Sequence, residues 1–446
     1  MNIEEIKRMA ASSGADAWEI TCRDRKDWEF YFIRHKLDQN RVVDVEHIDM
    51  KVYKKNRDQT RVGTASAEIA PTASAEEVKQ QIADLLYRAS LVQNPVFELR
   101  SPGENESAAA LMASEDSART DTEEDAQEGC SIAGAARDFI EVMKELPETE
   151  ETYVNSYEIF TKENTVRFIN SKGIDVTQKY PASFLEVVLN ARDREHEIEL
   201  YRSYDSGTCD REGLKEDLIR SFRTGIDRLH TQPTPAFESL PVVFATPDAV
   251  SIYKYFLDNL SAGQLYMKSS QWKIGEAIAK DMEGDRLTIR SLRYLPNSSC
   301  NLKYDSEGAL VRDCVLMRDA VPENFWGSRM YSEYLGLKNS FLVTNYSVSG
   351  GTGTPEQLRT GRYLEAAEFS DFQVDTLSGD IFGEIRLAYL HDDDKVIPVS
   401  GGSVSGNMKD LMKHMSMSRE QRQYNNARIP AVTRFENVTI AGDARR

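Results

Sequence analysis

The end of the chain contains two stretches that decide its fold, VSGGSVSGNMKDLMKHM at residues 399–415 and RFENVTIAGD at residues 434–443. In the first, Asn407 is placed to cap a short helix and Asp410 follows three residues later, a capping-box spacing that also puts a carboxylate at the positive helix end. Apolar side chains recur at helical spacing after the cap, at Met408, Leu411, Met412 and Met415. Such a stripe must pack on something. The second stretch is β-prone and ends at Gly442, which predicts a terminal strand beside the helix.

These features resemble the carboxyl-terminal signature of the TldD/PmbA family, whose members are sometimes labelled modulators of DNA gyrase. The resemblance rests on the glycine turn, the SGN opening, the KDL helix and the late VTIAG strand. An NS-x-G turn at residues 170–173 is similar to one in the same family. The resemblance covers most of residues 150–443 and implies a protein related to metallopeptidases.

Length and charge limit the classes of protein that fit. A chain of 446 residues is long enough for two or three domains. The net charge of −18 argues against phosphate neutralisation, so we expect no nucleic-acid partner. The start MNIEEIKRMA lacks a secretory pattern, and no apolar run is long enough to span a membrane. Five scattered cysteines fit reduced thiols. We therefore expect a cytoplasmic protein without membrane partners.

The first half of the sequence repeats one order of elements. Apolar spacing predicts a helix after Asn2. A capping box at Ser74 and Glu77 predicts a second helix that begins there and ends near residue 91. Between them, β-rich segments lie at residues 17–22, 28–33 and 41–53. A helix at 132–146, strands at 153–204 and a helix at 210–229 then follow in the same order, with a hairpin turn at 170–173. This order suggests a structural duplication.

Residues 101–129 lie between the two copies of this repeat. They carry nine acidic side chains and one basic one, with few bulky apolar residues. Such a segment buries too little surface to offset its ordering entropy, so it is predicted to be an acidic flexible loop. The alternative is an acidic recognition tail.

A proline-rich segment at residues 231–241 marks the predicted boundary between two domains, 1–230 and 231–446. Beyond it we expect a buried strand at 242–245 and a helix at 248–260. Further strands at 286–292 and 383–390 point to a largely antiparallel sheet. The predicted class is α+β, with helix and antiparallel-strand repeats in the first domain and a β-rich second domain with a few helices.

The helix at 248–260 is where the resemblance bears on catalysis. In the TldD-like branch this helix resembles a zincin, with an HExxxH motif whose histidines bind metal and whose glutamate activates water. In this chain Asp258, Asn259 and Gly263 occupy the motif's positions. None of the six histidines lies on the helix; they are His35, His47, His196, His230, His391 and His414. The resemblance therefore implies no catalytic residue, no metal ligand and no cofactor, and it leaves Asp258, Asn259 and Gly263 as candidate peptide-cleft positions.

Three other groups have simpler interpretations. The metal-capable residues 391–394 lie between two β-prone runs and are interpreted as a solvated hairpin tip. The glycine-rich residues 349–353 lack a following GK[ST], so they are interpreted as a loop that binds no phosphate. Cys300 and Cys314 are expected to be buried thiols rather than nucleophiles.

The segments AGQLYMKSS, DSEGALVRDCVLMRDA and YSEYLGL resemble the PmbA (TldE) branch, which is similar to the protease but lacks its metal site. The resemblance implies a non-zinc-binding subunit that pairs with a TldD-type, HExxxH-bearing homologue to process extended or unfolded peptides. Two alternatives stay open. One is a stand-alone homodimer that binds peptides, and the other is a peptidase with a metal site built elsewhere.

Overall fold

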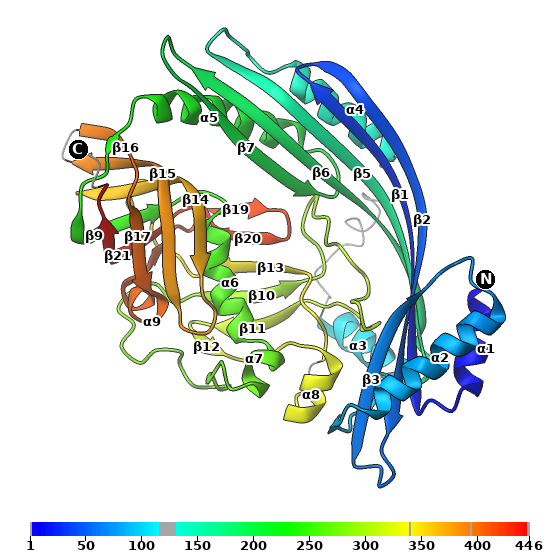
Figure 1. Ribbon diagram of the computed structural model, residues 1–446. Coiled ribbons are helices and arrows are strands. Elements are labelled where there is room, and N and C mark those ends of the chain that lie inside the picture. The colour runs from blue at the N-terminus through cyan, green and yellow to red at the C-terminus, as the bar shows by residue number, and fades with distance from the viewer. Residues whose placement is uncertain (1, 116–130, 339, 393–394, 444–446) are drawn as a thin grey trace.

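The computed structural model describes residues 2–115, 131–338, 340–392 and 395–443. A long curved sheet from the first half of the chain sweeps along one side of the molecule, and the second half packs beside it (Figure 1). Both halves mix helices with mostly antiparallel strands, so the predicted α+β class with two domains is confirmed.

The curved sheet has seven strands in the order β4-β3-β2-β1-β5-β6-β7, all paired antiparallel. Its centre is the pair formed by β1 (Ala17–Ile33) and β5 (Thr152–Asn170); β2 and β3 follow on one side and β6 and β7 on the other, with β4 added at the first edge. The outer strands are β2 (Lys36–Lys55), β3 (Arg61–Ile69), β4 (Asn94–Pro95), β6 (Asp175–Arg192) and β7 (Glu197–Ser206). The predicted break in β1 at residues 23–27 is wrong, because hydrogen bonds from both neighbouring strands continue through these charged residues.

Four helices cover the sheet in two pairs. Near one end lie α1 (Ile3–Ser12) and α2 (Ala75–Ser90), and near the other lie α4 (Ile132–Lys144) and α5 (Arg211–Leu229). The predicted order of helix, strands and helix thus occurs twice, although the predicted segments 17–22, 28–33 and 41–53 cover only β1 and β2, and β3 was not predicted. The caps are those that the sequence indicates: Asn2 caps α1, and Ser74 with Glu77 forms a complete capping box on α2.

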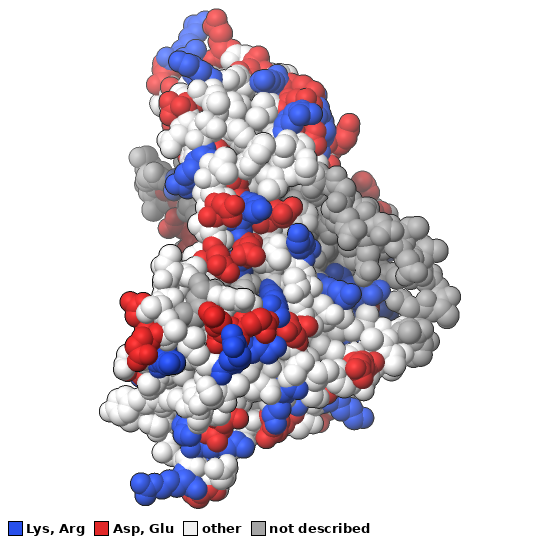
Figure 2. Space-filling view, turned by 90° about the vertical axis from the view of Figure 1, so that its right-hand side faces the viewer, with Lys and Arg blue, Asp and Glu red and all other residues white. Residues whose placement is uncertain are grey.

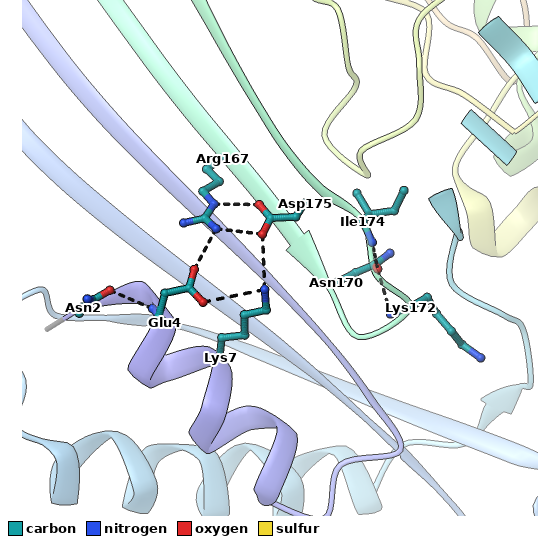
Figure 3. Close-up of polar contacts among 8 residues, drawn as sticks. All are labelled: Asn2, Glu4, Lys7, Arg167, Asn170, Lys172, Ile174 and Asp175. Carbon is teal, nitrogen blue, oxygen red and sulfur yellow. Dashed lines mark hydrogen bonds and ion pairs between the residues drawn. The ribbon is translucent and has the colours of Figure 1, made fainter. Parts of the chain in front are cut away.

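A polar network ties α1 to the second repeat (Figure 3). Arg167 on β5 donates to both carboxylate oxygens of Asp175 on β6, at 2.8 and 2.9 Å, and to Glu4 on α1 at 2.9 Å. Lys7 completes the ring with an ion pair to Asp175 at 3.4 Å. The network holds the first helix of one repeat against the central hairpin of the other.

The β5–β6 hairpin turn has the predicted NS-x-G form. The side-chain oxygen of Asn170 accepts hydrogen bonds from the backbone N–H groups of Lys172 and Ile174, both at 3.0 Å (Figure 3). Gly173 has a φ of 101°, which favours glycine at that position. The hairpin prediction is therefore confirmed.

Helix α3 (Pro102–Glu115) corrects the predicted loop at 101–129. Its first turn is anchored to the second half of the chain: Glu104 pairs with Arg329 at 2.8 Å, and the Asn105 amide donates to the carbonyl oxygen of Gly308 at 2.8 Å. The run of alanines from residue 108 to 110 also favours a helix. The amino-acid composition of the segment does not reveal these contacts, because the partner residues lie about 200 positions later in the chain. The rest of the predicted loop, residues 116–130, lies outside the described residues.

Two further sheets make up the second half of the chain. Five strands pair in a closed ring, because β14 contacts both β9 and β15 at the two ends of the order β14-β9-β21-β17-β15. These strands are β9 (Phe237–Phe244), β14 (Tyr363–Val374), β15 (Asp380–Asp392), β17 (Ser403–Asn407) and β21 (Thr433–Ala441). The shorter strands β8 (Gln232–Pro233), β16 (Lys395–Ser400) and β18 (Ser416–Met417) extend this sheet.

The third sheet has the order β12-β11-β10-β13-β20-β19. Its strands are β10 (Thr288–Leu292), β11 (Cys314–Arg318), β12 (Val321–Pro322), β13 (Asn345–Ser349), β19 (Gln421–Tyr424) and β20 (Ala427–Pro430). The helices of this half are α6 (Ala249–Asn259), α7 (Ala262–Tyr266), α8 (Arg329–Leu335), α9 (Met408–Leu411) and the 3-10 turn η2 (Met412–His414). No described helix is both long and apolar enough to cross a membrane.

The carboxyl-terminal signature forms part of the core of the second half. All four members of the predicted apolar stripe are buried: Met408, Leu411, Met412 and Met415. They lie in one cluster with Phe435 and Val438 of the closing strand β21, as predicted. Asn407 caps the helix, accepting from the N–H of Lys409 at 3.0 Å. Asp410 forms an ion pair with Lys413 at 3.4 Å rather than the predicted capping box.

The proline-rich residues 231–241 are less irregular than the sequence indicates. Strand β8 and the first part of β9 lie within them. Strand β9 therefore begins at Phe237, five residues before the strand predicted at 242–245. Pro233 ends β8, Pro235 lies between the two strands and Pro241 lies within β9. The prolines therefore do not mark a strand-free linker.

Candidate functional site

The residues predicted to occupy the HExxxH positions, Asp258, Asn259 and Gly263, lie where α6 ends and α7 begins. Asp258 and Asn259 are the last two residues of α6, whereas Gly263 belongs to α7, so the three positions are divided between two helices. Asp258 pairs with Lys254 one turn earlier. The buried Asn259 amide donates to the carbonyl oxygens of Tyr255 at 2.9 Å and Thr376 at 3.2 Å. These side chains join α6 to the loop after β14.

Gly263 lies against a cluster of tyrosines. A Cβ atom at this position would lie 3.5 Å from the ring of Tyr331. The ring centroids of Tyr266 on α7 are 5.4 Å from Tyr331 and 5.1 Å from Tyr334, both on α8. Two segments that the sequence analysis singled out separately, AGQLYMKSS and YSEYLGL, therefore meet here. Tyr266 is 39% exposed and Met267 is 58% exposed, so the cluster reaches the surface.

The described histidines do not gather into a metal site. His391 stacks on the ring of Tyr363 with centroids 4.2 Å apart, and its partial burial lowers its pKa. Asp392 pairs with Arg362 at 3.1 Å and lies opposite Lys395 across the β15–β16 hairpin, while residues 393 and 394 of the predicted tip lie outside the described residues. Within the described ranges, no group of three or more His, Cys, Asp or Glu side chains is placed to hold a metal ion.

Two of the described cysteines have raised pKa values. Burial raises the pKa of Cys300, and it raises the pKa of Cys22 to about 11. A thiol with a raised pKa stays protonated at neutral pH and is a poor nucleophile. Cys300 and Cys314 are half-buried rather than fully buried as predicted.

A pocket of about 500 Å³ lies where the two halves of the chain meet. The first half contributes Ile198 of β7 and Arg228 of α5. The second half contributes the rest of the wall and the floor: Ser370, Phe382, Glu384, Ile385, Arg386 and residues 400–403. This volume is within the range of small-molecule sites in proteins.

The floor of the pocket is the Gly401-Gly402 turn of the carboxyl-terminal signature. Both glycines have positive φ, 77° and 72°. The turn bonds to β15, because the N–H of Gly401 donates to the carbonyl of Ile385 at 2.9 Å and the N–H of Ile385 donates to the carbonyl of Gly402 at 3.1 Å. A Cβ atom on Gly402 would lie 2.0 Å from the carbonyl oxygen of Ala441. Only glycine fits there, so the signature sequence shapes the pocket.

The charged groups of the pocket differ in their partners. Arg228 pairs with Glu368 at 3.3 Å, and Arg202 pairs with the same carboxylate oxygen at 3.2 Å. Glu384 accepts a hydrogen bond from Ser370 at 2.6 Å. By contrast, no residue of the described chain forms a hydrogen bond or ion pair with the exposed Arg386 side chain or with the Ser403 hydroxyl.

Charges on one outer face of the molecule are mixed rather than separated. Figure 2 shows acidic and basic side chains side by side on the face turned toward the viewer, with no broad area of one sign. This face has no basic patch of the kind that binds nucleic acid.

Comparison with known proteins gives one family and a consistent fold. Residues 238–442 match the family model described as the PmbA/TldA metallopeptidase C-terminal domain. The crystal structure of TldE from Thermococcus kodakarensis is similar over 99% of this chain and 100% of that one, with 18% identity and a TM-score of 0.76. No curated protein matches the chain.

Two further solved structures are similar over 99% of this chain. One is a proposed modulator of a DNA gyrase from Thermotoga maritima, matched over 100% of its chain with 16% identity and a TM-score of 0.72. The other is a proposed modulator of DNA gyrase from Bacteroides thetaiotaomicron, matched over 98% of its chain with 16% identity and a TM-score of 0.76.

The fold matches these three structures along almost the whole chain, and the family model matches its second half. Residues 238–442 form a PmbA/TldA metallopeptidase C-terminal domain, as the sequence resemblance predicts.

Sequence reasoning missed the pocket. The signature stretch that contributes residues 400–403 stood out as a fold marker, and its paired glycines were a usable signal. Arg228 and Arg386 carried no such signal, because they lie 158 positions apart and on separate elements.

Proposed function

We propose that this chain is the non-zinc-binding, TldE-like subunit that pairs with a TldD-type metallopeptidase to process extended or unfolded peptides. The observation that carries the proposal is that the residues predicted at the HExxxH positions make contacts within the fold instead of forming a metal site. The Asn259 amide holds two backbone carbonyls, and Asp258 and Gly263 lie on separate helices. A chain that keeps the family's domain while using these positions structurally needs a partner to supply the metal.

The surface around these positions favours association with another protein chain. The tyrosine cluster of α7 and α8 continues into exposed apolar side chains, Met267 at 58% and Leu335 at 37% exposure. Tyrosine and methionine are enriched at protein interfaces. Asp258, Asn259 and Gly263 are proposed as positions beside the peptide cleft of the assembled pair, where they support the wall of the cleft rather than the chemistry.

The proposed setting is the cytoplasm. The described cysteines, Cys22, Cys209, Cys300 and Cys314, form no disulfide, which favours a reducing compartment. We also propose that residues 1–230 and 231–446 are two domains. The proposal is supported by the strand pairing, since the first sheet uses strands up to Ser206 and the other two use strands from Gln232 onward.

The first test is metal content and activity of the purified chain alone. We expect less than a tenth of an equivalent of zinc by elemental analysis, and no casein cleavage that a chelator abolishes. One zinc per chain together with chelator-sensitive cleavage would show instead a peptidase with a metal site built elsewhere.

The second test is pairing. The chain is mixed with an HExxxH-bearing homologue of the family and the mixture is analysed by light scattering and a casein assay. We expect a mixed dimer that cleaves casein faster than the homologue alone. A homologue that neither pairs with the chain nor gains activity would favour the alternative, a stand-alone homodimer that binds peptides.

A further inference from the structure

The pocket between α5 and the closed ring of strands combines two groups of unlike chemistry. On the outer face of β15, Phe382, Glu384 and Arg386 follow one another at alternate positions, so their side chains form a row with a spacing of about 6.5–7 Å. The row offers an aromatic ring, a carboxylate and a guanidinium in that order. Ile198 of β7 adds an apolar wall from the first half of the chain.

The pocket holds charged groups of both signs in an acidic protein. Arg228 and Arg386 line it together with Glu384, while Glu368 pairs with Arg228 and the Asp443 carboxylate lies against the Gly401 turn. The chain as a whole carries a net charge of −18. Within this mixed set, a guanidinium without a partner in the described chain is the group that attracts a ligand of opposite charge.

Three pocket groups are available to a ligand. The Arg386 guanidinium and the Ser403 hydroxyl form no hydrogen bond with any described residue, and one carboxylate oxygen of Glu384 accepts only from Ser370. Arg228 is held in place by Glu368 and is one-sixth exposed. Arginine binds carboxylates with two parallel hydrogen bonds, which makes Arg386 suited to a planar anion.

We propose that this pocket binds the carboxyl end of a peptide. The terminal carboxylate pairs with Arg386 and accepts from Ser403, the last backbone N–H donates to Glu384, and an apolar last side chain packs on Phe382 and Ile198. The inference deepens the proposed function, because it names the end of a peptide that this chain holds. Capture of one end by this chain leaves the remainder extended toward a partner subunit.

Binding is measured on the full chain without any partner, by calorimetry at low ionic strength. The probes are an acetylated alanine peptide of four residues that ends in leucine, the same peptide with a carboxyl-terminal amide, and N-acetylleucine. We expect the peptide acid to bind at least tenfold more tightly than the amide and more tightly than N-acetylleucine. Affinity for the acid falls as salt is added, because the contact with Arg386 is exposed.

Variants separate the roles of the groups. Arg386→Gln is expected to reduce affinity for the acid to that of the amide, whereas Phe382→Ala weakens both peptides by a similar factor. Arg57→Gln is the matched control, since it removes the same charge from an exposed turn outside the pocket. This control should leave the preference for the acid unchanged.

Three results would overturn the inference. They are no measurable binding of the acid at millimolar concentration, equal affinity for acid and amide, and an intact preference in Arg386→Gln. Equal affinity for N-acetylleucine and the peptide would replace the peptide with a small organic acid as the ligand. Because no partner is present, failure here is distinguishable from failure of the pairing proposal, which light scattering tests separately.

Discussion

The end of α6 lies within the second half of the chain, whereas the pocket at the Gly401-Gly402 turn lies where the two halves meet, and their polar groups are used differently. At α6, the Asn259 amide donates to two backbone carbonyls and Asp258 pairs with Lys254. In the pocket, Arg386 and Ser403 have no partner among the described residues. Both sets of residues are polar and lie near a chain reversal, so neither polarity nor a nearby turn distinguishes them.

The difference shows how a structural polar residue can be told from a binding site. A polar group whose hydrogen bonds are all made within the protein stabilises the fold and has little left for a ligand. An unpaired polar group that faces a cavity destabilises the fold little, provided that water hydrates it. A ligand can then displace that water. By this criterion Asn259 acts as a structural residue, and the pocket is the better candidate for a binding site.

The largest expected effect comes from Asn259→Glu, which restores the acidic residue of HExxxH. The new carboxylate would lie buried against the carbonyl oxygens of Tyr255 and Thr376, so an uncompensated buried charge would cost about 3–5 kcal/mol of unfolding free energy at pH 7. Urea unfolding measures this loss. A buried carboxyl has a raised pKa, so it is protonated at lower pH, and the loss should be smaller at pH 5 than at pH 7.

Asn259→Leu is the control for charge, since it removes the hydrogen bonds without adding an anion. We expect it to lose about 1–3 kcal/mol, the cost of leaving buried carbonyls unpaired. If Asn259→Glu were as stable as the unsubstituted chain at pH 7, the end of α6 would have room for a catalytic acid and the comparison with the pocket would fail.

The next effect, at the floor of the pocket, comes from Gly402→Ala. Its φ of 72° costs a residue with a Cβ atom about 1–2 kcal/mol. The 2.0 Å approach to the carbonyl oxygen of Ala441 adds a clash with backbone, which cannot rotate away. Gly361→Ala is the matched control, with a φ of 73° and no atom within 4 Å of its Cβ. We expect thermal unfolding to show a larger loss for Gly402→Ala than for Gly361→Ala, and equal losses would contradict the close packing of this turn.

The parts of the fold that the sequence predicted are those governed by neighbouring residues. The cap at Asn2, the capping box at Ser74 and the turn at Asn170 each depend on side chains within four positions. The methionine stripe from Met408 also needed only helical spacing, and its burial against β21 followed from the β-prone closing run. Local chemistry of this kind is readable without a structure.

The parts that the sequence did not predict depend on residues far apart in the chain. Helix α3 is held by Arg329 and Gly308, and the charged middle of β1 is held by pairing with β5 across more than 130 residues. The pocket likewise requires Arg228 beside Arg386. No spacing rule joins such positions, because the three-dimensional approach of the two halves brings them together.

Glu307, whose carboxylate lies where the two halves meet, is expected to have an effect of intermediate size on the unfolding free energy. Burial raises the pKa of Glu307 to about 7, although its side chain accepts from the N–H of Arg329 at 2.7 Å. Because the folded pKa lies above the unfolded value, the stabilising effect of the bound proton is complete below about pH 4.5 and is lost as pH rises through 7. Glu307→Gln should therefore be more stable than the unsubstituted chain at pH 8, by about 1–3 kcal/mol, and show no such gain at pH 4.5. An equal effect at both pH values would mean that Glu307 titrates normally.

The smallest expected effect is that of Arg386→Gln on stability, and it bears most directly on the comparison. Arg386 is exposed and has no partner in the described chain, so its loss should change the free energy of unfolding by no more than about 0.5 kcal/mol. Arg228→Gln removes the same charge from the opposite wall, but it breaks a half-buried pair with Glu368, and about 1–2 kcal/mol should be lost. Urea unfolding of both variants at one pH and salt concentration gives the contrast. If Arg386→Gln were as destabilising as Arg228→Gln, Arg386 would be a structural residue like Asn259, and the pocket would no longer differ from the end of α6 in the way that marks it as a binding site.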